Sequence, residues 1–223
     1  MNSMVGIKGL GKAFGAEVIL DGADFAADRG EAVALVGPSG SGKSTLLYIM
    51  GLLDSADQGV VTIDGARADD MGDDQRSALR LAKIGFVYQQ HNLFADFTAL
   101  ENAMIPLLMA GASMREAGAR ARECLAALGL EKKASAKAVE LSGGEAQRTA
   151  IARAIVLRPK ILLADEPTGN LDPKNGEMVF DLLLEMVRRE KMTAVVATHN
   201  PLLAKRLDRT VSIVDGRIKP SAL

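Results

Sequence analysis

The chain has 223 residues, 48% of them hydrophobic and 25% charged, and a formal net charge of −1 at pH 7. This length suits one large α/β domain with a small appended subdomain and a sizeable core. Acidic and basic residues are interspersed along the sequence. Because no basic block or stripe of aromatic and basic residues occurs, we expect no nucleic-acid partner.

The sequence also bears on compartment and membrane insertion. The first residues lack the basic and apolar segments of a signal peptide, and no apolar run approaches the ~18–20 residues that cross a bilayer. The single cysteine, Cys124, falls in a helical pattern without a disulfide partner in the chain. We therefore expect a reduced core thiol in a cytosolic protein. Any membrane role is expected to need a partner chain.

Short apolar strands alternate with helical patterns, which is typical of βαβ units and a mostly parallel sheet. Strands of this sheet are predicted at Val33–Val36, Gly85–Tyr88, Lys160–Ala164 and Thr193–Ala197. Shorter strands, expected to be antiparallel, are Met4–Lys8, Val18–Ala26, Val60–Ile63 and Thr210–Val214, with turns at Asp64-Gly65 and Asp215-Gly216. Residues 161–164 and 194–197 are apolar at every position, which indicates central strands covered on both faces.

The segment from Asn92 to Ala138 breaks this alternation and is predicted to be wholly helical. Thr98-Ala99-Leu100-Glu101 and Ser113-Met114-Arg115-Glu116 have the spacing of capping boxes, and Gly129 suits a helix C-terminus. We therefore predict a single domain over residues 1–223. Its core comprises residues 1–91 and 139–223, and residues 92–138 form an inserted helical subdomain.

The segment after the strand Val33–Val36 fits the phosphate-binding pattern G-x-x-x-x-G-K-[ST]. Glycines allow successive N–H groups to turn onto phosphate oxygens, and the following helix adds partial positive charge. We expect Lys43 to reach the β- and γ-phosphates and the Ser44 hydroxyl to bind Mg²⁺. The alternative, a glycine-rich turn with a solvated lysine, does not explain the strand and helix on either side. The predicted ATP-binding residues are Gly37, Pro38, Ser39, Gly40, Ser41, Gly42, Lys43, Ser44 and Thr45.

Two carboxylates, Asp165 and Glu166, follow the apolar run Ile161–Ala164. In an open parallel sheet, ligands bind beyond the carboxyl ends of the strands. Asp165 is therefore expected to face the phosphate loop and hold Mg²⁺. Glu166 is placed to polarise a water for in-line attack on the γ-phosphate. The alternative is an acidic turn after a buried strand.

Two more polar residues follow predicted strands. His199 comes after Thr193–Ala197, and its strand-end position favours a γ-phosphate contact over an ordinary surface histidine. Gln89 follows the end of another strand and is expected to reach Mg²⁺ or the attacking water.

The stretch Leu141-Ser142-Gly143-Gly144-Glu145 opens a predicted helix. Capping explains Ser142 and Glu145, but paired glycines in a first helical turn cost about 1 kcal/mol each against alanine. Such glycines make sense where an anion must approach the backbone closely. Because the chain already has a phosphate loop, this second anion site is expected to serve a nucleotide held by another molecule.

These residues, in this order, resemble the nucleotide-binding subunits of ATP-binding cassette (ABC) transporters over essentially the full chain. The resemblance identifies the phosphate loop as Walker A, Gln89 as the Gln-loop and Leu141–Glu145 as the signature. It also identifies a Walker B motif ending in Asp165-Glu166, a D-loop at Gly169-Asn170-Leu171-Asp172 and a switch histidine at His199.

The resemblance implies that two subunits sandwich two ATP molecules, with the signature of each facing the Walker A loop of the other. It implies that Ser142, Gly143 and Gly144 contact the γ-phosphate in trans, and that Asp172 supports communication across the homodimer. Phe14 matches the aromatic residue that stacks on adenine. An ordinary core phenylalanine is the alternative.

Within this family, three segments are similar to the ATPases of lipoprotein-releasing systems. They are Tyr88–Asn102, Pro106-Leu107-Leu108 and Pro167–Asp172. Those subunits power extraction of lipoproteins from the bacterial inner membrane, which implies transmembrane permease partners and a peripheral location on its cytoplasmic face. ATPases of macrolide-exporter-type pumps and FtsE-type cell-division systems are the alternative. Leu93, Phe94 and Phe97 are expected to contribute to docking of the membrane partner, or else to the subdomain core.

Two other classes of protein share parts of this pattern. Soluble ABC-type ATPases that act on DNA or ribosomes usually add coiled coils, zinc-binding cysteines or a second cassette, none of which occurs in this sequence. A small-molecule kinase would share the phosphate loop. It would not need the signature at Leu141–Glu145.

Overall fold

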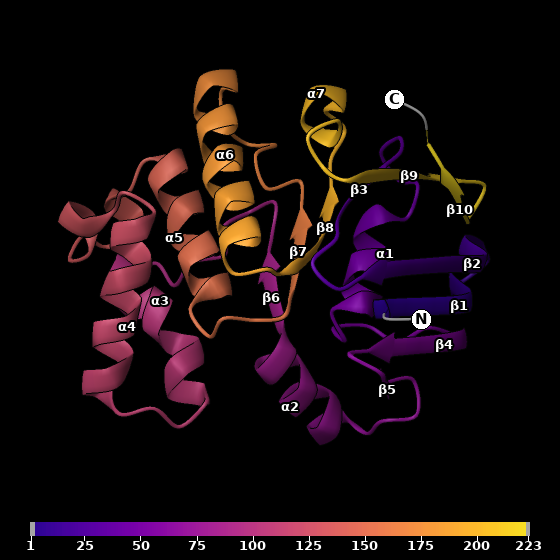
Figure 1. The fold of residues 1–223 in the computed structure, drawn as a ribbon, viewed down its shortest axis with the longest axis horizontal. Helices are drawn as coiled ribbons and strands as arrows, with labels where there is room; N and C mark the ends of the chain where they lie inside the picture. Colours follow the sequence, from indigo (N-terminus) through magenta and orange to yellow (C-terminus); the bar gives the residue numbers. More distant parts are fainter. Residues whose placement is uncertain (1–2, 222–223) are drawn as a thin grey trace.

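Two sheets and a layer of helices make up the computed structural model, which describes residues 3–221. Figure 1 shows the antiparallel sheet at one side, the six-stranded sheet in the middle and the helical layer at the other side. The strands are β1 (Ser3–Phe14), β2 (Glu17–Asp28), β3 (Ala32–Val36), β4 (Gln58–Ile63), β5 (Ala66–Arg67), β6 (Ile84–Val87), β7 (Ile161–Asp165), β8 (Thr193–Ala197), β9 (Arg209–Val214) and β10 (Arg217–Pro220). The α-helices are α1 (Lys43–Met50), α2 (Asp73–Lys83), α3 (Ala99–Met109), α4 (Met114–Ala127), α5 (Gly143–Ile155), α6 (Pro173–Arg189) and α7 (Pro201–Ala204), with 3₁₀ turns η1 (Glu131–Lys133) and η2 (Ala138–Glu140).

The six-stranded sheet has the order β10-β9-β3-β8-β7-β6, and all its neighbours are parallel except β9 and β10. The predicted parallel core and the antiparallel β1, β2 and β4 are confirmed. The expected antiparallel pairing of Thr210–Val214 is confirmed on one side of this strand and is wrong on the other. This strand, β9, follows a crossover through α7 and therefore runs parallel to β3. Only its hairpin to β10, at Asp215-Gly216, is antiparallel.

The central strands bury both faces, as their uninterrupted apolar sequences predict. In β7, Ile161 and Leu163 pack in the core around α1, whereas Leu162 and Ala164 pack in the core under the helical layer. The two cores therefore share the sheet as their common wall. Helix α1 covers one face of the sheet and α5 covers the other.

The helical layer differs from its prediction at its start. Residues 92–98 form no helix, so the segment 92–138 is not wholly helical. Thr98 begins α3 because its side chain caps Glu101 N, and Ser113 caps α4 in the same way; both predicted capping boxes are confirmed. Gly129 has φ +69° just beyond the end of α4, as expected of a helix C-terminus. Cys124 is buried in this layer, and burial raises the pKa of its thiol.

A helix that the sequence analysis does not predict, α2, joins the antiparallel sheet to β6. None of its residues is buried, and it begins at Gly72, which has no side chain to cap the helix. The sequence of α2 therefore lacks the N-cap side chain that usually marks the start of a helix.

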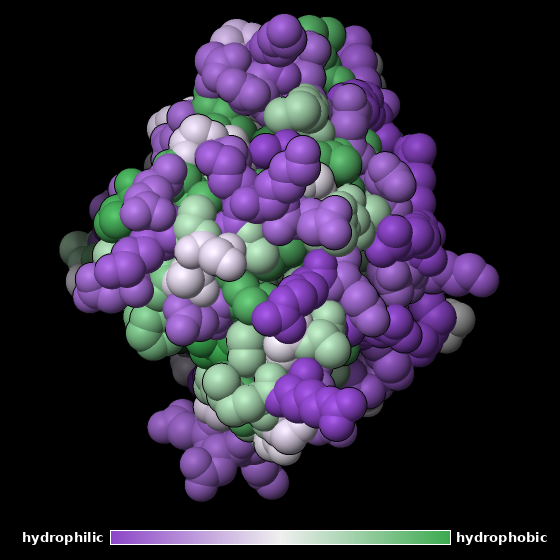
Figure 2. Space-filling model, turned by 90° about the vertical axis from the view of Figure 1, so that its left-hand side faces the viewer, coloured by the Kyte–Doolittle hydropathy of each residue, from purple (hydrophilic) through white to green (hydrophobic). Residues whose placement is uncertain are grey.

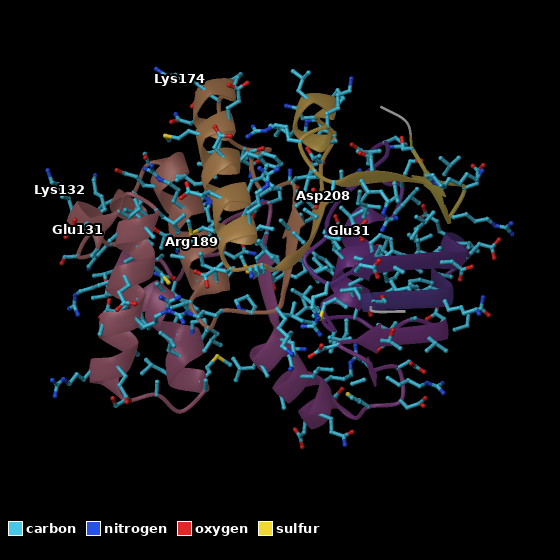
Figure 3. The ribbon with its side chains drawn as sticks, in the orientation of Figure 1. Glu31, Glu131, Lys132, Lys174, Arg189 and Asp208 are labelled. Carbon is cyan, nitrogen blue, oxygen red and sulfur yellow. The ribbon has the colours of Figure 1, made fainter. Side chains whose placement is uncertain are left out.

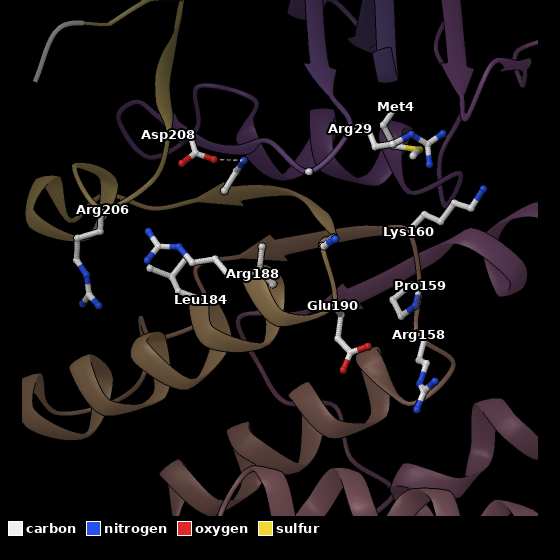
Figure 4. Close-up of a pocket in the computed structure, with 14 residues that line it drawn as sticks. Met4, Arg29, Arg158, Pro159, Lys160, Leu184, Arg188, Glu190, Arg206 and Asp208 are labelled. Carbon is white, nitrogen blue, oxygen red and sulfur yellow. Dashed lines mark hydrogen bonds between the residues drawn. The ribbon is translucent and has the colours of Figure 1, made fainter. Parts of the chain in front are cut away.

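A cavity of about 700 Å³ lies at the edge of the sheet where the parallel strands begin. Arg158, Lys160 and Arg206 are among its lining residues, but Figure 4 shows these side chains directed apart rather than toward a common point. Asp208 at its rim accepts a hydrogen bond from Ala32 N at 2.8 Å. None of the predicted site residues lines this cavity.

Asp64 joins the two sheets electrostatically. Its carboxylate lies 3.0 Å from the Arg29 guanidinium, 2.9 Å from Lys83 Nζ and 2.7 Å from Lys160 Nζ. The hydrogen bonds from Lys160 and Lys83 lower the pKa of Asp64 to about 2. Asp64 also has φ +49° in a turn before Gly65, a conformation that Asn and Asp tolerate.

We expect Asp64→Asn to lower the free energy of unfolding by about 1–2 kcal/mol at pH 7, allowing for solvent screening of the partly exposed cations. Asparagine keeps the turn and removes only the charge. Because the folded-state pKa lies below the ordinary value of 3.8, the stabilisation is complete above about pH 5 and disappears as the pH falls toward 2. Urea titrations of both proteins across this range measure it. Asp215→Asn, in the matching turn before Gly216, is the control, and an equal loss in both variants would contradict the assignment.

Candidate functional site

Four neighbouring parallel strands, β3, β8, β7 and β6, end at the same edge of the core sheet. The phosphate loop follows β3, His199 follows β8, Asp165 ends β7 just before Glu166, and Gln89 follows β6. The structure thus brings the predicted residues of the strand ends to one edge. The sheet order explains why they converge although they are distant in sequence.

The phosphate loop folds around the Lys43 side chain. Lys43 is buried, and its Nζ donates to the carbonyls of Gly37 and Pro38 at 2.8 and 2.9 Å. Gly42 has φ +96° and directly precedes α1; a Cβ there would lie 2.8 Å from Ile19 Cγ2. The loop therefore requires glycine at this position for both conformation and space.

Ser41 supports a fit to an anionic ligand. Its Oγ is buried and has no hydrogen-bond partner in the described residues. A Cβ on Gly37 would come within 2.7 Å of this oxygen, so the glycine keeps the space beside it open. An unsatisfied buried hydroxyl inside a loop of backbone N–H groups suits phosphate oxygens.

Asp165 and Ser44 provide the oxygen ligands that Mg²⁺ prefers. Asp165 is 4% exposed, and burial raises the pKa of its carboxyl, while a hydrogen bond from the Ser44 hydroxyl acts in the opposite direction. A buried carboxylate beside a hydroxyl and the Lys43 ammonium therefore fits a bound cation and phosphate. Within residues 3–221, no group of three or more His, Cys, Asp or Glu side chains could hold a metal. Phosphate oxygens would have to complete the shell.

Glu166 is held in an uncommon conformation. Its φ is +45°, its N–H donates to Ala197 O at 3.0 Å, and its Oε2 lies 2.8 Å from His199 Nδ1. The hydrogen bond to Ala197 O joins the end of β7 to the end of β8. The contact with His199 joins two predicted catalytic side chains. Strained backbone of this kind, next to a second predicted catalytic side chain, is consistent with a functional role for Glu166.

Gln89 is exposed and lies close to the D-loop. Its Nε2 is 3.6 Å from the position that a Cβ on Gly169 would take, and Asn170 Nδ2 donates to its carbonyl at 3.0 Å. Asp172 caps α6, accepting from Asn175 N at 3.1 Å, and is also exposed. The two loops therefore contact each other within one chain.

The signature residues are at the start of α5, in the helical layer. Ser142 is the N-cap, and Ser142 and Gly143 are exposed, whereas Leu141 packs against the core. Glu145 completes the capping box by accepting from Ser142 N at 2.9 Å. Because α5 and α1 cover opposite faces of the sheet, the signature is not part of the same chain's phosphate loop.

Sequence reasoning missed the side chains that hold the segment around Gln89. Arg153 donates to the carbonyls of His91 and Asn92 at 2.8 and 2.7 Å, and Gln147 donates to Tyr88 O at 3.3 Å. Both donors belong to α5, so the Gln-loop is attached to the signature helix. The available signal was Gln147, a buried polar residue on the apolar face of a helix.

Phe14 lies at the end of β1, where the residue is 54% exposed, and Lys12 Nζ is 5.0 Å from the ring centre. The alternative of a core phenylalanine is therefore wrong. An exposed ring beside a cation is suited to stacking on a base. Its contact with adenine stays a prediction.

A glycine-rich phosphate loop between β3 and α1, with Asp165 and Glu166 at a nearby strand end, defines a P-loop NTPase. The sequence model of the family described as "ABC transporter" matches residues 20–169, more than half of the chain. The chain belongs to this family and is an ATPase of the cassette type.

Curated relatives match nearly the whole chain. The "Lipoprotein-releasing system ATP-binding protein LolD 1" of Rhodospirillum rubrum is 52% identical over 200 residues, 90% of this chain and 88% of the relative. The "Lipoprotein-releasing system ATP-binding protein LolD" of Bacteroides thetaiotaomicron is 50% identical over 97% of this chain and 99% of the relative.

Solved structures match the fold equally well. "Dimeric Structure of MJ0796, a Bacterial ABC Transporter Cassette" has a TM-score of 0.90 and 42% identity, covering 97% of each chain. A structure of the same cassette, described as a dimeric post-hydrolysis state bound to ADP and Pi, has a TM-score of 0.89 and 40% identity, covering 99% of this chain and 100% of that one. Within residues 3–221, no helix is long and apolar enough to span a bilayer.

Proposed function

We propose that this chain is the ATP-hydrolysing subunit of a lipoprotein-releasing ABC system, acting as a homodimer on separate transmembrane subunits. Its location is the cytoplasmic face of a bacterial inner membrane, and its cofactor is Mg²⁺. The names of the relatives at 50–52% identity support the choice of system. The dimeric cassette at 42% identity supports the homodimer.

The observation that carries the dimeric mechanism is the pair of glycines at the start of α5. Neither Gly143 nor Gly144 has a positive φ, and a Cβ on either would meet ordinary van der Waals neighbours at 3.5 and 3.9 Å. Nothing within the chain therefore requires glycine here, although glycine costs helix stability. A ligand from outside the chain, approaching the exposed helix N-terminus, explains both residues.

In this proposal, Lys43 and the loop N–H groups hold the phosphates of one ATP, and Phe14 stacks on its adenine. The partner's signature completes the site through the Ser142 hydroxyl and the N–H groups of Gly143 and Gly144. Ser44, Asp165 and Gln89 would hold Mg²⁺, which supplies charge neutralisation on the phosphates when bound.

Glu166 orients the attacking water, and His199, 2.8 Å from its carboxylate, positions that group and contacts the γ-phosphate. Hydrolysis separates the γ-phosphate from ADP and removes the charge that bridges the two subunits, so the dimer reopens. The D-loop contacts the Gln-loop of its own chain through Asn170. In this proposal, the D-loop and its residue Asp172 couple the two ATP sites of the dimer.

A groove between the core and the helical layer is the proposed docking site of the membrane subunits. The cavity measures about 490 Å³ and is mostly apolar, with Leu81 of α2, Phe86 of β6 and Met109 of α3 in its wall. Tyr88, the residue before Gln89, also lines it, so an occupant would contact the Gln-loop. Figure 2 shows apolar side chains gathered in the lower half of the helical face.

The residues that the sequence analysis expects to contribute to docking lie outside this groove. Leu93, Phe94 and Phe97 do not line the cavity. Phe94 and Phe97 are 55% and 43% exposed, with their ring centres 5.4 Å apart, so they do not form a subdomain core. The pair remains a second candidate contact for the membrane partner.

We expect Met109→Glu to reduce complex formation with the membrane subunits and the stimulation of ATP hydrolysis that they cause, both by about tenfold, because docking would bury an unpaired carboxylate. Co-purification and hydrolysis assays measure these effects. Met114→Glu is the matched control, since Met109 and Met114 are 69% and 67% exposed and only Met109 lines the groove. Equal behaviour of the two variants would argue against this groove, and a loss confined to Phe97→Glu would place docking on the phenylalanine pair.

The cargo is tested by affinity purification of the tagged chain from detergent-solubilised membranes. The expected result is a complex with transmembrane subunits that, after reconstitution in vesicles, releases a lipoprotein only with hydrolysable ATP. A complex that instead expels a macrolide, or one with a cell-division protein, would overturn the lipoprotein assignment. The ATPase assignment would survive either outcome.

A further inference from the structure

The signature carries a carboxylate beside the surface that the proposed function assigns to a phosphate. Glu145 is the third residue of α5, one turn from the exposed Ser142 and Gly143. Its Oε2 accepts from Ser142 N at 2.9 Å, which anchors the side chain at the helix N-terminus. This hydrogen bond, followed by the contact with Lys133, lowers the pKa of Glu145, so the group is ionised at neutral pH.

An ionised carboxylate here has two opposing effects. It stabilises α5, because negative charge at a helix N-terminus complements the helix dipole. It also opposes the approach of any second anion, since it offsets the partial positive charge that makes a helix N-terminus attract phosphate. A signature with an uncompensated glutamate is therefore a poorer phosphate site than one without it.

Lys133 supplies the compensation. Its Nζ lies 3.1 Å from Glu145 Oε1, the carboxylate oxygen that the capping hydrogen bond leaves available. Lys133 belongs to η1, in the connection between α4 and α5, so a separate element carries the cation to the signature. The pair is neutral as a whole, and its field at a nearby phosphate is weaker than that of the carboxylate alone.

The neighbouring lysine shows that this placement is specific to Lys133. Lys132 is exposed, and Figure 3 shows it at the outer end of the helical layer, pointing away from the protein. It forms no ion pair among the described residues. Lys132 and Lys133 thus share charge and sequence context but differ in contact with the signature.

We propose that Lys133 is a charge-compensating and positioning residue for the partner's nucleotide, acting through Glu145. The inference rests on the in-trans role of the signature proposed above. The proposal predicts that Lys133 is needed for a normal KM for ATP because position 145 is a glutamate. Lys133 should become dispensable when the charge of Glu145 is removed.

The test compares Lys133→Ala, Glu145→Gln and the double variant in the full-length chain. Lys133→Ala is expected to raise the KM for ATP about two- to fivefold, the range of a single charge at a helix N-terminus, with little change in kcat. Glutamine preserves the capping box and removes the carboxylate that opposes an approaching anion, so Glu145→Gln should lower the KM for ATP. The double variant should return KM to within about twofold of the natural chain.

Thermal unfolding, the Lys132→Ala variant and Lys133→Arg serve as controls. Lys132→Ala and Lys133→Arg should keep the natural KM. An unchanged KM in Lys133→Ala, an equal rise in Lys132→Ala, or no rescue in the double variant would overturn the inference. Gly144→Leu, assayed in parallel, separates the two levels: its full activity would refute the in-trans signature itself, whereas its inactivity beside a normal Lys133→Ala would refute only the role of Lys133.

Discussion

Replacing Glu166 by glutamine is expected to slow ATP hydrolysis by about 10²–10⁴-fold while ATP binding is retained. The glutamine side chain has nearly the same shape and can still hydrogen-bond to His199 Nδ1, which lies 2.8 Å from the carboxylate in the natural chain. It cannot accept a proton from water as a carboxylate can. With ATP bound and not hydrolysed, the two subunits should remain closed on each other.

Steady-state hydrolysis and size-exclusion chromatography with ATP measure the two parts of this expectation. Glu166→Gln should elute as a dimer with ATP and as a monomer with ADP. Glu177→Gln, a change at an exposed glutamate of α6 outside the site, is the control and should hydrolyse ATP normally. Near-normal turnover by Glu166→Gln would refute the assigned role, and a monomer in ATP would refute closure driven by nucleotide.

The strand-end residues were predictable because the physical rule behind them is local. An apolar run buried on both faces ends at the sheet edge, so Asp165 at the end of β7 and His199 after β8 emerge on the side of the phosphate loop. The capping boxes of α3 and α4 were readable for the same reason, because each consists of neighbouring residues that satisfy each other's hydrogen bonds.

Features that depend on tertiary contacts were not readable in this way. The direction of β9 follows from its crossover through α7, whereas the visible turn signal at Asp215-Gly216 describes only the hairpin beyond it. The contacts of Arg153 and Lys133 join segments whose spatial relation is set by packing of the helical layer. Leu93 and Phe97 follow Gln89 in sequence, but the groove is built from α2, β6, α3 and α5.

Replacing Gly144 by leucine is expected to reduce ATP hydrolysis at least ~10²-fold, the scale expected when a reacting group is displaced by about 1 Å. The first carbon of the added side chain has room within the chain, since a Cβ on Gly144 would meet its nearest atoms, those of Asn175, at 3.9 Å. Leucine also favours the helix over glycine by about 0.5–1 kcal/mol. The variant should therefore fold at least as stably as the natural chain and still bind ATP through its own phosphate loop.

The combination of intact folding, intact ATP binding and lost hydrolysis assigns Gly144 to the hydrolytic site rather than to folding of the chain. Thermal unfolding, binding of a fluorescent ATP analogue and hydrolysis measure the three properties. Gly118→Ala, at a glycine inside α4, is the matched control and should leave all three unimpaired. Mixing Gly144→Leu with Lys43→Ala sharpens the result, because a mixed dimer has one site with an intact phosphate loop and an intact signature. Recovery of hydrolysis in the mixture is expected, and its absence would show that Gly144 acts inside its own subunit.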